Sequence, residues 1–320
     1  MPTETTPSAI GEPAKARSVK LVSTADLFIA FGLTLAAAIS WALPERYWRR
    51  LCASFAPLSL RMLSSDPERT IRKIGETLGD RPVACSPETI VRNLAAADIE
   101  TTFQCLRDYR PGGWNASLRL RGQAHIETAL ERGNGVILWI GEFSFRSLPT
   151  KMAFHRAGIP VSHLSHPRHG FSGTRFGMAV LNPVRSARED RYLAERVMLS
   201  LDGPIGAMRV LRRRLSENRV VSITVGGAAR HPVSIPFLDG NLKLATGAPD
   251  LAFRTKAVLL PVFSVRDEAG LITVEVTPPL EVPVSVPRGE AMEAVMKRFA
   301  QVFETWVLRY PDQLMGWFDL

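Results

Sequence analysis

The sequence predicts an α/β domain with a mostly parallel central sheet flanked by helices, preceded by an N-terminal membrane-anchoring helix. Short, β-branched apolar runs alternate with helical patterns from residue 116 onward, and Gly, Pro or charged residues bound each run. A charge-free apolar stretch near the N-terminus predicts the anchor. The 320 residues, 46% of them hydrophobic, suffice for a substantial core.

The N-terminal part divides into a leader and an anchor. Residues 1–22 are rich in Pro, Thr, Ser and Ala, which indicates a disordered leader. Residues 23–58 are predicted to form a membrane anchor and an interfacial segment, and residues 59–320 the α/β domain. Within the anchor, residues 27–44 carry no charge. As a helix they would measure about 27 Å, just short of a bilayer's hydrocarbon layer, so they either span it or lie in the interface.

A cleavable signal peptide is the alternative to an anchor. The apolar run is long, however, and Pro44 ends it without a small-residue cleavage site. Aromatic and arginine residues follow at 46–50, a pattern typical of a membrane interface. We therefore expect an uncleaved anchor.

The predicted elements of the domain follow in order. Residues 60–112 are expected to be helical, with Ser86 as an N-cap and Pro87 at the first helical position of one helix. Strands are predicted at 136–140, 159–164, 220–225, 258–265 and 271–276. Helices are predicted near 147–157, 204–217, 246–256 and 288–310.

Composition restricts the classes of partner. Lys and Arg number 40 against 31 Asp and Glu, a net charge of +9 that favours an anionic partner such as a phosphate-bearing lipid, an acidic carrier protein or a membrane surface. No RNP, zinc-finger or helix-turn-helix signature supports nucleic acid. Three cysteines without C-x-x-C spacing argue against a disulfide framework or a zinc site and favour a reducing compartment.

The turn after the first predicted strand carries the most informative pattern. The run 136–140 leads into Gly141, Glu142 and, five residues after Glu142, Ser147. This layout resembles the lipid A late acyltransferases, the lauroyl/myristoyl branch of the lysophospholipid acyltransferase superfamily, whose strand runs into G-H-F-G-N-W-E with a catalytic His and an acid beyond it. Further segments resemble the family at 235–240 (IPFLDG), 246–254 (TGAPDLAFR) and 303–313 (FETWVLRYPDQ).

The resemblance implies a glycerolipid acyltransferase-like fold and a function. A membrane-associated enzyme of this kind transfers a fatty acyl group from an acyl-carrier-protein or coenzyme A thioester to a lipid or glycolipid acceptor. It needs no cofactor besides the donor thioester and no metal. The catalytic domain would lie on the cytoplasmic side of the inner membrane.

The chain departs from the family at the chemistry. Glu142 stands at the His position and Ser147 at the acid position, and no His-x4-Asp/Glu occurs elsewhere. Glu142 is a candidate general base, although a carboxylate with an ordinary pKa near ~4.3 requires burial to act near neutrality. Alternatively, Glu142 is vestigial and faces solvent or pairs with Arg146. A Ser-based acyl-enzyme is a minor hypothesis, because the surroundings are not G-x-S-x-G.

A cluster of histidines follows the second predicted strand. His163, His166 and His169 lie in VSHLSHPRHG, where a histidine from a neighbouring strand could replace the lost base, with His163 and His166 as the first candidates. Their spacing does not match a standard zinc set.

Substrate-binding candidates are mainly arginines. The resemblance places Arg168, Arg175 and Arg196 where family members present basic residues to phosphorylated groups, and the guanidinium suits such recognition. Arg146, Asp239 and Thr246 complete the predicted binding set, the last two from the retained IPFLDG and TGA segments. A catalytically silent relative that binds lipid or regulates a true acyltransferase remains the alternative to an enzyme, because fold does not decide function.

Overall fold

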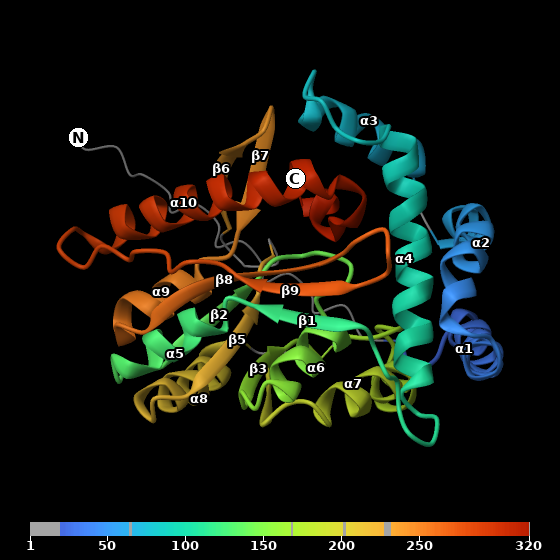
Figure 1. The fold of residues 1–320 in the computed structure, drawn as a ribbon, viewed down its shortest axis with the longest axis horizontal. Coiled ribbons are helices and arrows are strands. Elements are labelled where there is room, and N and C mark those ends of the chain that lie inside the picture. Colours follow the sequence, from blue (N-terminus) through green and yellow to red (C-terminus); the bar gives the residue numbers. More distant parts are fainter. Residues whose placement is uncertain (1–19, 64–65, 168, 201–202, 227–231, 320) are drawn as a thin grey trace, which may run out of the picture.

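The computed structural model describes residues 20–63, 66–167, 169–200, 203–226 and 232–319. A central sheet carries helices on both faces, which confirms the predicted α/β class (Figure 1). The strands are β1 (Leu118–Arg121), β2 (Val136–Ile140), β3 (Val161–Ser165), β4 (Glu195–Met198), β5 (Val220–Thr224), β6 (Val233–Phe237), β7 (Gly240–Leu244), β8 (Val258–Arg266) and β9 (Ile272–Val276).

Helices connect these strands and cover the sheet. The α-helices are α1 (Thr24–Ala42), α2 (Trp48–Leu63), α3 (Pro67–Leu78), α4 (Pro87–Arg107), α5 (Gln123–Glu131), α6 (Leu148–Arg156), α7 (Asn182–Asp190), α8 (Ile205–Ser216), α9 (Gly247–Thr255) and α10 (Arg288–Arg309). Short helical turns are η1 (Glu45–Tyr47), η2 (Gly177–Leu181), η3 (Pro311–Gln313) and η4 (Met315–Asp319).

The strand order places the loops that follow the parallel strands at the same edge of the sheet. Within the described residues the main sheet has seven strands in the order β1-β9-β8-β2-β5-β3-β4. Neighbours are parallel except β8 and β9. Strands β8, β2, β5, β3 and β4 therefore end at the same edge, the position where open α/β sheets bind ligands. The β6–β7 hairpin is a separate antiparallel pair.

The sheet is buried on both faces around β2. Ile137 and Trp139 join one apolar cluster with residues of α8, α9 and α10. Val136, Leu138 and Ile140 join another with residues of α5 and α6. This double burial explains why β2 is a continuous apolar run instead of an alternating one.

Most predicted elements are present, and the missed strands are not continuous apolar runs. The predicted strands and helices correspond to β2, β3, β5, β8, β9, α6, α8, α9 and α10. Strands β1 (LRLR) and β4 (ERVM) were not predicted; both lie at the edges of the sheet, where half of the side chains are polar. The hairpin β6–β7 was not predicted either. Its strands alternate exposed and buried residues, which is the pattern of a half-buried strand, but the segment was assigned only to a family motif.

The predicted anchor is α1, and α4 separates it from the α/β body. Helices α1 and α2 pack on the outer side of α4 (Figure 1). Among the described helices, α1 is long and apolar enough to cross a membrane, with a mean hydropathy of 1.7. A signal sequence passes the same test. Of the predicted leader at 1–22, residues 1–19 lie outside the described part of the chain.

Candidate active site

The turn after β2 is fixed to the C-terminal segment. The backbone N–H of Ser144 donates to the Gln313 carbonyl at 2.8 Å, and the N–H of Met315 donates to the Glu142 carbonyl at 2.7 Å. Phe143 and Phe145 are fully buried on either side of Ser144. Gly141 is required in this turn because a Cβ there would lie 2.7 Å from the ring of Phe263. The turn that carries the altered motif is therefore rigid.

Glu142 lies at this turn beside Arg146. Its Oε1 is 3.7 Å from Nε of Arg146, and 22% of its side chain is exposed. The structure thus contains the Glu142–Arg146 pair that the alternative prediction names. Glu142 does not line the pocket described next, whereas Arg146 does.

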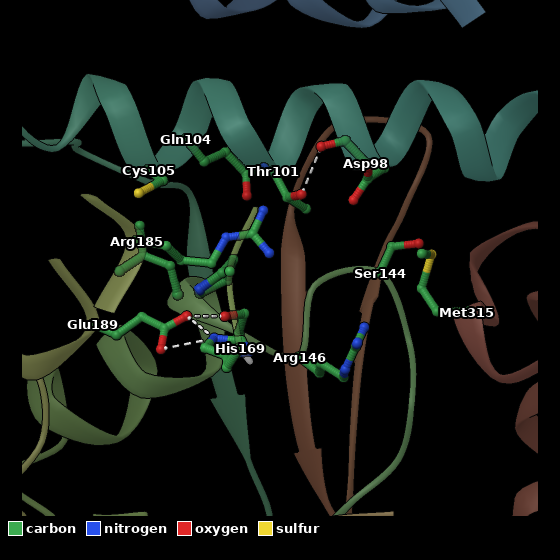
Figure 2. A pocket seen from close by; sticks show the side chains of 14 residues that line it. Asp98, Thr101, Gln104, Cys105, Ser144, Arg146, His169, Arg185, Glu189 and Met315 are labelled. Atoms are coloured by element: carbon green, nitrogen blue, oxygen red, sulfur yellow. Dashed lines mark hydrogen bonds and ion pairs between the residues drawn. The ribbon is translucent and has the colours of Figure 1, made fainter. Parts of the chain in front are cut away.

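A pocket of about 230 Å³ opens beside the turn. Figure 2 shows side chains converging on it from α4, the β2 turn, the loop after β3, α7 and η4. Its lining residues are Asp98, Thr101, Gln104, Cys105, Ser144, Arg146, Ser147, Leu148, Pro149, His169, Gly170, Arg185, Glu189 and Met315.

Glu189 is the centre of the polar network behind this pocket. Its carboxylate is fully buried and lies 3.2 Å from Nζ of Lys151, 2.9 Å from a terminal nitrogen of Arg196 and 3.0 Å from Nε2 of His169. The hydroxyl of Ser147 also donates to it. Burial alone would raise the pKa of Glu189, but Lys151, His169 and Arg196 outweigh burial and hold the pKa well below its usual range. Glu189 is therefore ionised.

His169 connects this carboxylate to the pocket. Burial lowers the pKa of His169, although the hydrogen bond to Glu189 opposes the change. The imidazole is therefore neutral at pH 7. Since an ionised carboxylate only accepts, Nε2 carries the proton that bonds Glu189, and Nδ1 keeps a lone pair for a further proton. The arrangement is that of a general base oriented by an acid.

The loop that carries His169 is held by Asn182 of α7. The Asn182 Oδ1 accepts from the backbone N–H of Phe171 at 2.7 Å and of Ser172 at 3.0 Å, and its Nδ2 donates to the Ser172 carbonyl at 2.9 Å. Gly170 has a φ of +151°, and a Cβ there would lie 2.4 Å from Asn182. Only glycine allows the loop to approach α7 this closely.

The cationic partners of Glu189 are engaged inside the protein. Arg196 bonds Asp190 at 2.6 Å and the Ser165 hydroxyl at 2.9 Å in addition to Glu189, and only 10% of its side chain is exposed. Lys151 is 5% exposed, and burial lowers its pKa while Glu189 opposes the change. Arg196, the predicted first contact for substrate, thus lies behind the pocket with its N–H groups committed to protein acceptors.

The other predicted catalytic histidines lie apart from the pocket. His163 is buried on β3, and its Nδ1 is 2.8 Å from the hydroxyl of Ser222. Burial and the nearby Lys151 hold the pKa of His163 well below its usual value. His166 is exposed, and neither residue is among the pocket lining. Ser147 does line the pocket, but its hydroxyl proton is held by a carboxylate whose low pKa makes it a poor base for a serine nucleophile.

The remaining predicted binding residues are dispersed. Arg175 is exposed outside the pocket, and Arg168 lies outside the described residues. Asp239, in the turn between β6 and β7, pairs with Arg81 at 2.7 Å. Thr246 is the N-cap residue of α9, and neither Asp239 nor Thr246 lines the pocket.

The sequence analysis missed Glu189 and two further polar residues of the pocket, Gln104 and Arg185. Gln104 is 1% exposed, and neither polar atom of its amide has a hydrogen-bond partner among the described residues. In Figure 2 its side chain extends from α4 toward the pocket. Arg185 lies over the ring of Phe171 at 4.8 Å and forms no ion pair with a described carboxylate. The sequence contains one indication for Gln104, a polar residue next to Phe103 on the buried side of a helix. It contains no comparable indication for Arg185.

The described residues contain no group of three or more His, Cys, Asp or Glu placed to hold a metal ion. Fold and site together define an α/β protein with an oriented His–carboxylate pair at a polar pocket near the carboxyl ends of its strands. Residues 175–319 match the family model described as bacterial lipid A biosynthesis acyltransferase, which supports the family that the motifs indicated. The matched segment includes Arg185 and Glu189 and begins after the β2 turn and His169. A comparison with curated proteins found no match.

Proposed function

We propose that this protein is a membrane-associated acyltransferase in which His169 and Glu189 replace the missing His/acid pair of the motif. The observation that carries the proposal is the 3.0 Å contact between His169 Nε2 and the buried Glu189 carboxylate at the pocket wall. A neutral imidazole oriented by an ionised acid is the arrangement that general-base catalysis requires.

In the proposed reaction, Nδ1 of His169 takes the proton from the acceptor hydroxyl as its oxygen attacks the thioester carbonyl. The imidazolium that forms is stabilised by Glu189. Collapse of the tetrahedral intermediate breaks the C–S bond, and His169 returns the proton to the thiolate. The products are an ester of the acceptor and a free thiol.

Two pocket groups suit the negative charge that develops during this reaction. The amide N–H groups of Gln104 have no partner among the described residues, and Arg185 forms no ion pair with a described carboxylate. Donors that are already in place and shielded from water stabilise an oxyanion strongly. Gln104 and Arg185 are thus the proposed oxyanion or phosphate contacts, in place of Arg196.

The donor is an acyl-carrier-protein or coenzyme A thioester, and the acceptor is a membrane lipid or glycolipid of the lipid A or lysophospholipid type. The family supports an acyl donor and a lipid acceptor in general. The net charge of +9 suits these anionic partners and an anionic membrane surface. In this proposal α1 attaches the protein to the inner membrane with the catalytic domain on the cytoplasmic side.

A catalytically silent relative that binds lipid or regulates a true acyltransferase is the second candidate. The observation that favours it is the presence of Glu142 and Ser147 where the motif requires a His and an acid.

The test compares His169→Gln with His166→Gln, an exposed neighbour outside the pocket, and with Glu142→Gln. Thiol release from acyl-coenzyme A and from an acylated carrier protein is measured with a phosphorylated glucosamine glycolipid as acceptor. His169→Gln should lower kcat/KM by roughly 100-fold or more, the scale of a general-base contribution. The other two variants should stay within about 10-fold of the wild type.

The outcomes separate three hypotheses. If Glu142→Gln removes the activity and His169→Gln does not, Glu142 is the base. If the wild type releases no thiol with either donor but binds vesicles of the acceptor glycolipid, the silent-relative hypothesis is correct. Thermal unfolding of each variant distinguishes a chemical loss from a folding defect.

A further inference from the structure

Helix α1 presents two different faces. Its outer face is apolar and exposed, with Phe28 and Phe31 each 72% exposed, Leu27 65% and Leu35 53%. Its inner face packs on the protein, where Ala36 and Ile39 contact the cluster of Trp48, Cys52 and Phe103. Only 11% of the most apolar window is buried. An exposed apolar face of this size indicates a partner outside the described chain.

The N-terminal end of α1 is fixed to the loop that follows β3. Asp26 is fully buried, and its two oxygens accept from the hydroxyls of Ser172 at 2.6 Å and Thr174 at 2.8 Å. The hydrogen bond from Ser172 lowers the pKa of Asp26 against the effect of burial. The backbone N–H of Arg175 also donates to the Lys20 carbonyl at 3.0 Å.

The C-terminal end of α1 is fixed to the end of α4. The indole N–H of Trp41 donates to the Leu106 carbonyl at 2.9 Å. The Arg107 guanidinium donates to the carbonyl of Leu43, at 2.5 Å. Both ends of α1 are therefore bonded to one and the same α/β domain.

These contacts are incompatible with α1 crossing a bilayer. A helix of 19 residues is about 28 Å long, so a spanning α1 would place its two ends on opposite membrane surfaces. The domain bonded to both ends would then lie along the helix inside the hydrocarbon layer. Charged groups of that domain, such as Arg107 and Arg110 at the end of α4, would be taken out of water at high cost.

We propose that α1 lies in the plane of the membrane surface, with its outer face in the lipid and its inner face on the domain. This inference rests on the membrane association proposed above and specifies its geometry. The exposed Arg46, Arg49 and Arg50 follow α1 directly and match an anionic lipid surface in charge. An in-plane α1 also keeps the loop carrying His169, three residues before Ser172, close to the lipid headgroups.

The first experiment places one cysteine beyond each end of α1, as Lys20→Cys and Arg46→Cys, in a Cys85→Ser background. Both positions are exposed, whereas Cys52 and Cys105 are buried thiols whose pKa burial raises to about 12, so they react poorly with maleimides. Intact spheroplasts and inverted inner-membrane vesicles are treated with a membrane-impermeant maleimide. Both cysteines should be labelled from the same side. Labelling from opposite sides overturns the in-plane helix and leaves membrane association standing.

The second experiment tests the lipid-facing residues. Phe28→Glu/Phe31→Glu should lower partition of the purified protein onto vesicles containing anionic phospholipid by roughly 10-fold or more, because the inserted apolar face is lost. The matched control is Ile205→Glu on α8, which replaces another exposed apolar side chain, 75% exposed, and should leave partition unchanged. Equal partition of the Phe28/Phe31 variant and the wild type overturns the proposed face. A wild-type protein recovered in the soluble fraction without detergent overturns both the in-plane helix and membrane association, while thiol release tests the chemistry independently.

Discussion

Glu142 and Glu189 are two carboxylates near one pocket with very different surroundings. Glu142 occupies the position at which the family motif places its base, is 22% exposed and has Arg146 at 3.7 Å. Glu189 occupies no motif position, is fully buried and contacts Lys151, His169 and Arg196 within 3.2 Å. Under the proposed mechanism, the carboxylate that organises the proton transfer is distinguished by its burial and its partners, and it does not occupy the motif position.

The difference has an energetic reason. A buried charge is tolerated only when paired and hydrogen-bonded, so the Glu189 network must be complete to be stable. A partly exposed ion pair such as Glu142–Arg146 contributes little, because water competes with both partners. Rigid geometry, which catalysis needs, is therefore a property of the Glu189 network and of the loop that Asn182 holds.

Removal of the Glu189 charge should give the largest effect. Glu189→Gln leaves Lys151 and Arg196 buried without their shared partner, so the free energy of unfolding should fall by about 3–5 kcal/mol. Glu142→Gln, the matched change at the other carboxylate, should cost less than about 1 kcal/mol. Urea denaturation of both variants measures the contrast, and equal losses would remove the distinction between the two sites.

The sequence predicted the layers of the fold well because the signals are local. A buried parallel strand is a continuous apolar run, and β2, β5 and β8 are such runs. The edge strands β1 and β4 were not predicted because each has only four residues, two of which are charged. Hydrophobic periodicity does not identify a strand this short and polar. Only its hydrogen bonds to a neighbouring strand define it.

The site was predicted only in part, for a related reason. His169 belongs to the predicted histidine cluster, although His163 and His166 were its first candidates, and the predicted turn at 141–147 contributes residues to the pocket wall. The partner of His169, however, lies 20 residues along the chain on another element, α7, which was not predicted. A search for His-x4-acid spacing does not find a pair that only the fold brings together. The exposed His166 and the pocket-lining His169 are likewise indistinguishable by residue type.

The buried His163 and the partly buried His169 should make stability depend on pH. The folded-state pKa of His163 and of His169 lies below the ordinary 6.5, mainly because of burial. As pH falls below about 6.5, the unfolded chain therefore binds protons that the folded chain does not, and stability is lost. Each histidine contributes a slope of up to about 1.4 kcal/mol per pH unit.

His163→Gln tests this slope without touching the pocket. The amide keeps a hydrogen-bonding group near Ser222 but does not titrate, so unfolding free energy should fall less steeply between pH 6.5 and pH 5 than in the wild type. Identical slopes for the variant and the wild type would mean that His163 titrates equally in the folded and unfolded chain.

Asp239 should give the smallest effect and extends the comparison to a second motif position. It belongs to the family-like IPFLDG segment, yet its carboxylate is 49% exposed and bonded to Arg81 outside the pocket. Asp239→Asn should therefore change the unfolding free energy by less than about 1 kcal/mol and leave KM for donor and acceptor unchanged. Arg81→Ala is the matched control, because it removes the same ion pair from the other side. If Asp239→Asn raised KM about 10-fold while Arg81→Ala did not, Asp239 would bind substrate as its motif position implies, and burial would cease to be the better guide at this part of the chain.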